Sequence, residues 1–286
     1  MRTDRVPPGS AWAPVRWASG WERHKSLVLE LFVLTNFAFL TLDIYLAHSV
    51  NRFRHPAEWI PFWFSAVAAA SLAPCAFLQW KNRSGVAARR LGLGLGYSSI
   101  AVGIAGLLYH LDSQFFGLWT LKSLVYTAPF LAPLCYSGLG FLLILNRTVD
   151  HHDRQWSQWV TFFALGGFVG NFVLSLADHA QNGFFHISEW IPVVASALAI
   201  GFLFVALGQR DRQFYRHCFL VLVMQALVGI LGFYLHFDAS INGFSSSLFE
   251  NFVYGAPILA PLLFANLFLL GAIGIGEELL RRDAGA

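Results

Sequence analysis

The sequence predicts an all-α, polytopic integral membrane protein with about eight transmembrane helices, built as two parallel four-helix repeats. The first observation behind this prediction is composition: 12% of the 286 residues are charged and 56% are hydrophobic, against about 25% charged in an ordinary soluble domain. Such a chain has too few polar side chains to cover itself in water, so lipid must solvate much of its surface. Eight spans leave no room for a separate soluble catalytic domain.

The second observation is a series of eight apolar runs bounded by charged clusters, each long enough to cross the roughly 30 Å hydrocarbon core. They predict spans at 26–47, 57–80, 91–111, 122–146, 159–178, 188–208, 217–236 and 252–276. Residues 1–25 lack an apolar core typical of a signal peptide and form an N-terminal tail. The two repeats then occupy 26–147 and 159–278, joined by a linker at 148–158 and followed by a C-terminal tail at 279–286.

Basic residues gather after every second span. They are Lys81, Arg83, Arg89, Arg90, Arg147, Arg154, Arg210, Arg212, Arg216, Arg281 and Arg282. The positive-inside rule assigns these connections, and with them both chain termini, to the cytoplasmic side, and we expect a bacterial inner or plasma membrane. The opposite, outward side is poor in Lys and Arg and rich in histidine. The net charge of +3 does not indicate a nucleic-acid partner, and no pattern indicates an oligomeric state.

The third observation is an internal repeat. Residues 48–68 align without gaps on 179–199, with 11 of 21 positions identical. In the same order, 103–112 matches 229–238, and 125–134 matches 253–262. Because each half contains an even number of predicted spans, both halves cross the membrane in the same sense, as parallel repeats do.

The repeat also duplicates a set of metal-ligating residue types at the outer helix ends. The first half carries His48, His55, Glu58, His110 and Asp112, and the second carries His179, His186, Glu189, His236 and Asp238. The His-x-x-Glu spacing places both side chains on one helix face. Imidazoles and carboxylates without thiolates suit Fe, Zn, Mn or Cu(II), so the sequence predicts a divalent transition metal as cofactor, at one site in each half or at a shared cluster.

Each of these residues also has an ordinary structural interpretation. Glu58 and Glu189 stand in a first helical turn, where a carboxylate complements the helix dipole. Asp112 and Asp238 could cap a short helix that follows, and a lone interfacial histidine is often only amphipathic. Tyr126 and Tyr254 recur near the histidine level; they are either interfacial belt residues or, together with Glu58 and Glu189, candidate catalytic groups.

Two further repeated features concern the backbone. Pro129 with Pro133, and Pro257 with Pro261, are expected to bend their spans and to free backbone carbonyls that protein or water must satisfy. Gly103 with Gly106, and Gly229 with Gly232, are expected to allow neighbouring helices to approach closely. These are the repeated glycines and prolines of the matching segments.

These features favour a membrane metalloprotein with redox or metal-assisted hydrolytic chemistry at its outer surface. A metal-ion or small-solute transporter, with the histidines as an outer vestibule, is the alternative, and a haem protein with axial histidines is the third reading. Transport requires polar groups near the bilayer midplane. Glu30 and Asp43 lie towards opposite ends of the first span, and the sequence offers them no ionisable companion deep in another span.

Overall fold

A computed structural model describes the backbone over residues 12–83, 85–209 and 211–284, and the side chains over 20–281 within these ranges. The described residues form helices and connections, with no strand. In order, the elements are α1 (Trp12–Ser49), η1 (Pro56–Glu58), α2 (Trp59–Trp80), α3 (Val86–Asp112), α4 (Phe115–Leu118), α5 (Leu121–Tyr126), α6 (Leu134–Thr148), α7 (Arg154–Gln181), η2 (Ile187–Glu189), α8 (Trp190–Gly208), α9 (Arg212–Ile241), α10 (Leu248–Tyr254) and α11 (Leu262–Ala284).

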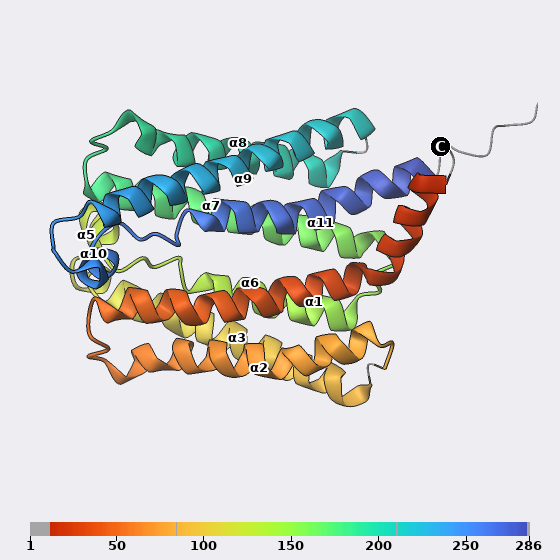
Figure 1. Cartoon of the computed structure of the whole chain (residues 1–286), viewed down its shortest axis with the longest axis horizontal. Coiled ribbons are helices and arrows are strands. Elements are labelled where there is room, and N and C mark those ends of the chain that lie inside the picture. Colours follow the sequence, from red (N-terminus) through yellow and green to blue (C-terminus); the bar gives the residue numbers. More distant parts are fainter. Residues whose placement is uncertain (1–11, 84, 210, 285–286) are drawn as a thin grey trace, which may run out of the picture.

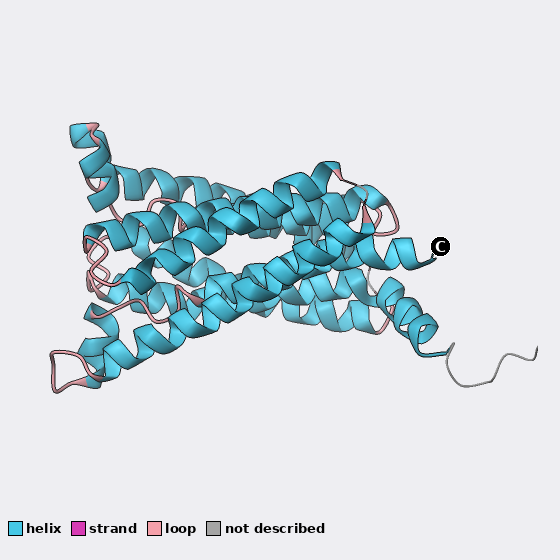
Figure 2. Cartoon of the chain, turned by 90° about the horizontal axis from the view of Figure 1, so that it is seen from above, coloured by secondary structure: helices cyan, strands magenta, loops and turns pink. Residues whose placement is uncertain are grey.

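The long helices lie side by side in two groups (Figure 1), and Figure 2 shows the same bundle of helices from above. In the first group α1 packs on α2 and α3 packs on α6; in the second, α7 packs on α8 and α9 packs on α11. The groups meet through α1 with α11 and α6 with α7. The short helices α5 and α10 lie at the left end of Figure 1 and cross between the groups, because α5 contacts α7 and α10 contacts α1.

Within the described residues, seven helices are long and apolar enough to cross a membrane, which confirms the helical, membrane-spanning character of the chain. The count of eight is not reached, because the predicted span 122–146 is not one helix. It consists of α5, a break at 127–133, and α6, which has only 15 residues. The predicted span 252–276 is broken in the same way between α10 and α11. Both breaks contain two prolines, which cannot donate the backbone hydrogen bonds of a continuous helix.

Large apolar side chains cover the outside of the helix bundle. Trp63, Phe77, Val194, Phe204 and Leu220 each expose more than half of their surface. The buried core lies where the two groups meet and along α1, α6, α7 and α11. Apolar residues on both the inside and the outside are expected of helices solvated by lipid, so a lipid bilayer is the environment that this surface requires.

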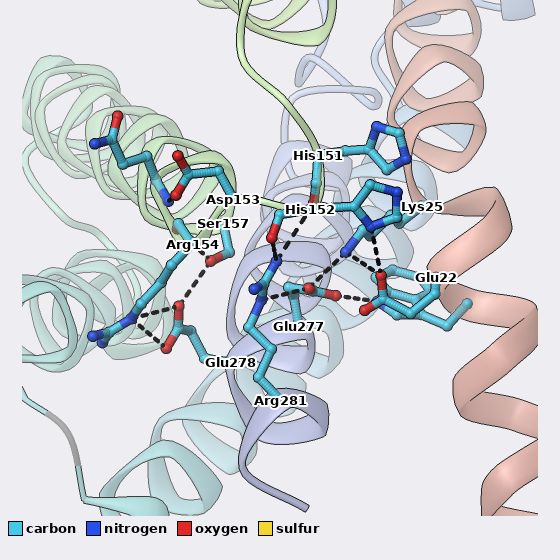
Figure 3. Close-up of polar contacts among 12 residues, drawn as sticks. Glu22, Lys25, His151, His152, Asp153, Arg154, Ser157, Glu277, Glu278 and Arg281 are labelled. Atoms are coloured by element: carbon cyan, nitrogen blue, oxygen red, sulfur yellow. Dashed lines mark hydrogen bonds and ion pairs between the residues drawn. The ribbon is translucent and has the colours of Figure 1, made fainter. Parts of the chain in front are cut away.

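The end of the bundle opposite α5 and α10 holds a network of buried charges, which we call the arginine end (Figure 3). The fully buried ammonium of Lys25 bridges Glu22 at 2.7 Å and Glu277 at 2.8 Å. Glu277 also accepts a hydrogen bond from Arg281, at 2.6 Å. These contacts tie the beginning of α1 to the end of α11, so the two groups of helices are joined by ion pairs as well as by apolar packing.

Glu30 has a partner that was not predicted, in the last turn of α6 and just past the predicted span 122–146. Its fully buried carboxylate accepts hydrogen bonds from both terminal nitrogens of Arg147 on α6, at 2.8 and 2.5 Å. Glu30 therefore has an ionisable companion in another helix. The pair could not be predicted from local sequence, because 117 residues separate its members. Arg147 also belongs to the basic residues that were used only to assign the cytoplasmic side.

Candidate metal centres

A tight turn after α1 returns the chain toward His48. Arg52 and Phe53 both adopt left-handed backbone conformations, with φ of 55° and 49°, and the amide of Phe53 donates to the carbonyl of His48 at 3.2 Å. The ring of Phe53 then stacks on Trp59 with centroids 4.1 Å apart. Left-handed conformations at two successive non-glycine residues are costly. Here they fold the loop so that Glu58 faces the imidazole at the end of α1.

His48 and Glu58 approach each other without making a hydrogen bond. The His48 Nδ1 atom lies 3.8 Å from Oε2 of Glu58, and both side chains are only about one sixth exposed. Hydrogen bonds between such groups fall at about 2.7–3.2 Å. Two ligand atoms held about 2.0–2.2 Å from one metal ion in tetrahedral geometry stand about 3.4 Å apart. The observed separation is thus too long for a hydrogen bond, and a small side-chain movement would let one ion bridge the pair.

The Glu58 carboxylate leaves one oxygen unsatisfied. Its Oε2 atom is buried and has no hydrogen-bond partner within the described structure. The side chain also makes no capping hydrogen bond to the helix that follows, so capping does not explain its position. A buried charged oxygen without a partner costs considerable free energy, and a cation beside His48 would remove that cost.

His110 at the end of α3 completes the first group. Its ring centroid lies 6.3 Å from that of His48, and Glu58 interacts electrostatically with both imidazoles. The Nδ1–H of His110 donates to the carbonyl of Pro129 at 2.9 Å, since a carbonyl can only accept. This bond fixes the tautomer and leaves the lone pair on Nε2, which is how a second hydrogen bond orients metal-ligating histidines.

The two prolines of the break explain why this carbonyl is available. In a continuous helix the Pro129 carbonyl would accept from the amide four residues later, but that residue is Pro133, which has no amide hydrogen. The helix therefore breaks, and the Pro129 carbonyl accepts from the amide of Ala132 at 3.1 Å and from His110 on α3. The prediction that these prolines free carbonyls for other partners is confirmed at this position.

Glycine brings α3 close enough for that contact. A Cβ atom on Gly106 would collide with the ring of Pro133, and one on Gly103 would collide with Ser137 and with the Pro133 carbonyl. In the second half, Gly229 and Gly232 lie against Pro261 in the same way. The close helix approach that the sequence predicts at these glycines is confirmed, and it places the helices that carry His110 and His236 beside the proline breaks.

The second half contains the same contacts. His179 Nδ1 lies 3.7 Å from Oε2 of Glu189, which is again buried and unpartnered. His236 interacts electrostatically with His179, and its Nδ1–H donates to the Pro257 carbonyl at 2.9 Å. The left-handed turn recurs at Gly183 and Phe184. We call His48, Glu58 and His110 the first centre, and His179, Glu189 and His236 the second centre.

The other four predicted ligands lie apart from these centres. His55 and His186 are exposed in the loops, and Nδ1 of His55 accepts from the amide of Ala57 at 3.4 Å. Asp112 and Asp238 are exposed as well. Neither aspartate caps the short helix that follows, because the N-cap residues of α4 and α10 are Gln114 and Ser247. The Asp238 carboxylate accepts from Asn242 at 3.2 Å.

The two predicted tyrosines end α5 and α10 and are nearly half exposed, Tyr126 at 48% and Tyr254 at 46%. Each short helix belongs to one half of the sequence and contacts a long helix of the other half. One hydrogen bond joins α5 to the long helix of the other half: the side-chain amide of Gln181 on α7 donates to the carbonyl of Val125 at 2.7 Å. The end of α7, which carries His179, is thus held by the residue preceding Tyr126.

A third group was not predicted as a site. Asp150, His151 and His152 offer ligand atoms that all lie within 4.8 Å of one another, a spacing tighter than any other such group in the described residues. They lie in the loop between α6 and α7, and Figure 3 shows His151 and His152 at the arginine end. The amide of His152 donates to Asp150 at 2.9 Å and lowers the pKa of that carboxyl, while burial lowers the pKa of His151. Arg281 donates to the carbonyl of His152 at 2.8 Å, so the backbone of this loop belongs to the ion-pair network.

Comparisons with known proteins add no relative. The chain matches no family model, no curated protein and no solved structure.

Proposed function

We propose that this chain is an integral membrane metalloprotein that holds one divalent transition metal ion in each of its two centres. The observation that carries the proposal is the buried, unpartnered Oε2 atom of Glu58 beside His48, together with its counterpart on Glu189 beside His179. If only one half had a buried carboxylate oxygen without a hydrogen-bond partner next to an imidazole, the arrangement could be a feature of that half alone. The same arrangement in both halves supports a common ligand.

The donor atoms favour iron or zinc within the range of Fe, Zn, Mn and Cu(II). Two imidazoles and one carboxylate are the ligand set of non-haem Fe(II) oxygenases and of catalytic zinc sites. Three protein ligands leave at least one coordination position open, whereas structural zinc sites are closed by four. This ligand set therefore supports a reactive centre that admits water or a small substrate.

A metal bound there would supply Lewis acidity for hydrolysis or a redox couple for oxidative chemistry. The residues of the chain hold and orient it. Glu58 provides the negative charge, and the bond from His110 Nδ1–H to the Pro129 carbonyl leaves Nε2 as the nitrogen of that ring that can face a metal. Both imidazoles of the first centre are partly exposed, so reactants can arrive from the aqueous side.

We further propose that the two centres belong to two parallel repeats and that the end carrying them faces outward. The paired contacts of His48 with Glu58 and His179 with Glu189, at 3.8 and 3.7 Å, support a shared origin. The concentration of basic residues at the opposite end supports the orientation.

The test is element analysis of the gently purified full chain after growth with metal supplementation. Wild type is expected to carry two equivalents of metal, Glu58→Gln and Glu189→Gln one each, and the double variant none, because the amide keeps the shape but loses the charge. Asp112→Asn and Asp238→Asn are matched controls, since they neutralise exposed carboxylates at the same end. We expect both controls to keep two equivalents.

Two results would overturn the proposal: wild type without stoichiometric metal, or a double variant that retains the full content. An absorption spectrum of the same samples separates the haem alternative, since a Soret band would identify bound haem. Loss of the metal in a folded double variant, with an unchanged helical circular dichroism spectrum, distinguishes loss of the site from loss of the fold.

One observation favours transport as a second candidate function. Asn36 on α1 and Asn266 on α11 exchange two side-chain hydrogen bonds, of 3.1 and 2.6 Å, where the two halves meet. They line a small cavity of about 80 Å³ together with Cys135, and Cys135 interacts electrostatically with Asp43. Metal uptake into proteoliposomes that falls in Asn36→Leu would favour transport, whereas metal binding without uptake would favour chemistry at the surface.

A further inference from the structure

A groove of about 570 Å³ runs between α1 and α2 on the outside of the bundle. Leu27, Leu31 and Leu34 form one wall. On the other side Ala73 and Ala76 leave space that larger side chains would fill, and Phe77 and Trp80 complete the wall. His24 lies at the end nearest the basic residues. The groove is independent of the two candidate metal centres, which lie at the opposite end of the bundle.

The length of the groove matches one leaflet of a bilayer. His24 and Leu34 both line it, and ten residues of helix extend about 15 Å. The hydrocarbon core is about 30 Å thick, so the groove extends from the interface to about the midplane. An elongated apolar chain that begins at the interface fits this space, whereas a compact solute would leave part of the leucine wall uncovered.

The mouth of the groove is positively charged. The ammonium of Lys81 lies 4.2 Å from the ring centroid of Trp80 and 5.8 Å from that of Phe77, two of the lining residues. Arg23 precedes His24 and Arg83 follows Lys81 by two residues in the sequence, and both arginines are exposed. In the described part of the chain, no carboxylate lies within ion-pair distance of Lys81. A cation held over aromatic rings at the membrane interface is placed to meet an anionic headgroup.

We propose that this groove binds an anionic phospholipid, with one acyl chain along the leucine wall and the phosphate beside Lys81. Apolar burial holds the chain, and the basic mouth selects the headgroup. A zwitterionic lipid has the same acyl chain but carries a compensating positive charge. The charge at the mouth therefore predicts a preference between lipids that differ only in their headgroups.

The test is native mass spectrometry of the purified, delipidated full chain, titrated separately with dioleoyl phosphatidylglycerol and dioleoyl phosphatidylcholine. Wild type is expected to bind the first phosphatidylglycerol more tightly. Because one basic side chain near an anionic surface contributes about 1 kcal/mol, Lys81→Gln should weaken that binding by about fivefold and leave phosphatidylcholine unchanged. Ala73→Phe, which fills the groove from an exposed position, should weaken both lipids.

Lys122→Gln removes an exposed lysine near the opposite end, and Ala70→Phe adds the same bulk to an exposed position of α2 outside the groove. Both controls should bind as wild type does. Circular dichroism of each variant establishes that it is folded. The proposal is overturned if wild type binds the two lipids equally, or if folded Lys81→Gln keeps the full preference.

Discussion

Replacing Arg147 by Met tests the buried ion pair at the arginine end. Glu30 is fully buried and receives three N–H donors: two from Arg147, at 2.8 and 2.5 Å, and one from the Asn146 amide at 3.1 Å. Methionine fills much of the arginine volume but donates no hydrogen bond. The substitution therefore leaves the Glu30 carboxylate buried, without its counter-charge and with one donor of three.

Breaking a buried ion pair from one side costs about 3–5 kcal/mol. Two lost hydrogen bonds to a charged group, at about 1.5–3 kcal/mol each, give a similar figure. We expect Arg147→Met to lower the free energy of unfolding by this amount. The double variant Glu30→Gln with Arg147→Met removes the orphaned charge, so it should recover most of the loss. Arg90→Met replaces an exposed arginine and should stay within about 0.5 kcal/mol of wild type.

The assay is reversible unfolding of the full chain in mixed micelles with increasing sodium dodecyl sulfate, followed by circular dichroism. The reasoning is refuted if Arg147→Met loses less than about 1 kcal/mol, the value typical of exposed pairs. A double variant as unstable as the single one would also refute it, because the penalty would then arise from lost packing and not from the buried charge.

Three further substitutions test contacts between the helices. Gly106→Leu should displace α3 from the proline break and reduce bound metal by one equivalent, while Gly94→Leu, with open space around its Cα, should keep both equivalents. Pro133→Ala supplies an amide donor that competes with His110 for the Pro129 carbonyl. Element analysis should therefore show weaker metal retention in the first centre alone. Asn36→Leu leaves the amide of Asn266 unpaired and should lower the free energy of unfolding by about 1–3 kcal/mol. Replacing both residues by Leu should restore stability. A double variant as unstable as the single one would exclude a specific amide pair.

The sequence predicted the features that depend on local composition. The apolar runs gave the approximate positions of the long helices, although α1 begins at Trp12 and not at residue 26, and α6 at Leu134 and not at residue 122. The double prolines indicated where two spans would bend. They could not show that the first interruption shortens α6 to 15 residues. That boundary depends on how the freed backbone groups find partners in α3, a contact that no local pattern encodes.

The ten duplicated residues illustrate the same limit at the site. Spacing alone gave His55 and Glu58 equal standing, because both recur at the helix ends that were predicted to face outward. The structure turns the Glu58 carboxylate inward, toward His48, and leaves His55 exposed with its Nδ1 accepting from the neighbouring amide of Ala57. The difference arises from the left-handed turn at Arg52 and Phe53, a conformation that neither residue type favours and that the sequence therefore does not signal.

By itself, the sequence determined the solvent of this protein and the residue types available for chemistry, because hydropathy and repetition are properties of the chain. Only the tertiary structure decided which of those residues meet. It brought Glu58 within 3.8 Å of His48, joined His110 to the Pro129 carbonyl, and paired Glu30 with Arg147 across 117 residues. Such contacts depend on the close packing of helices distant in sequence, where glycine and proline set which backbone and side-chain atoms can approach.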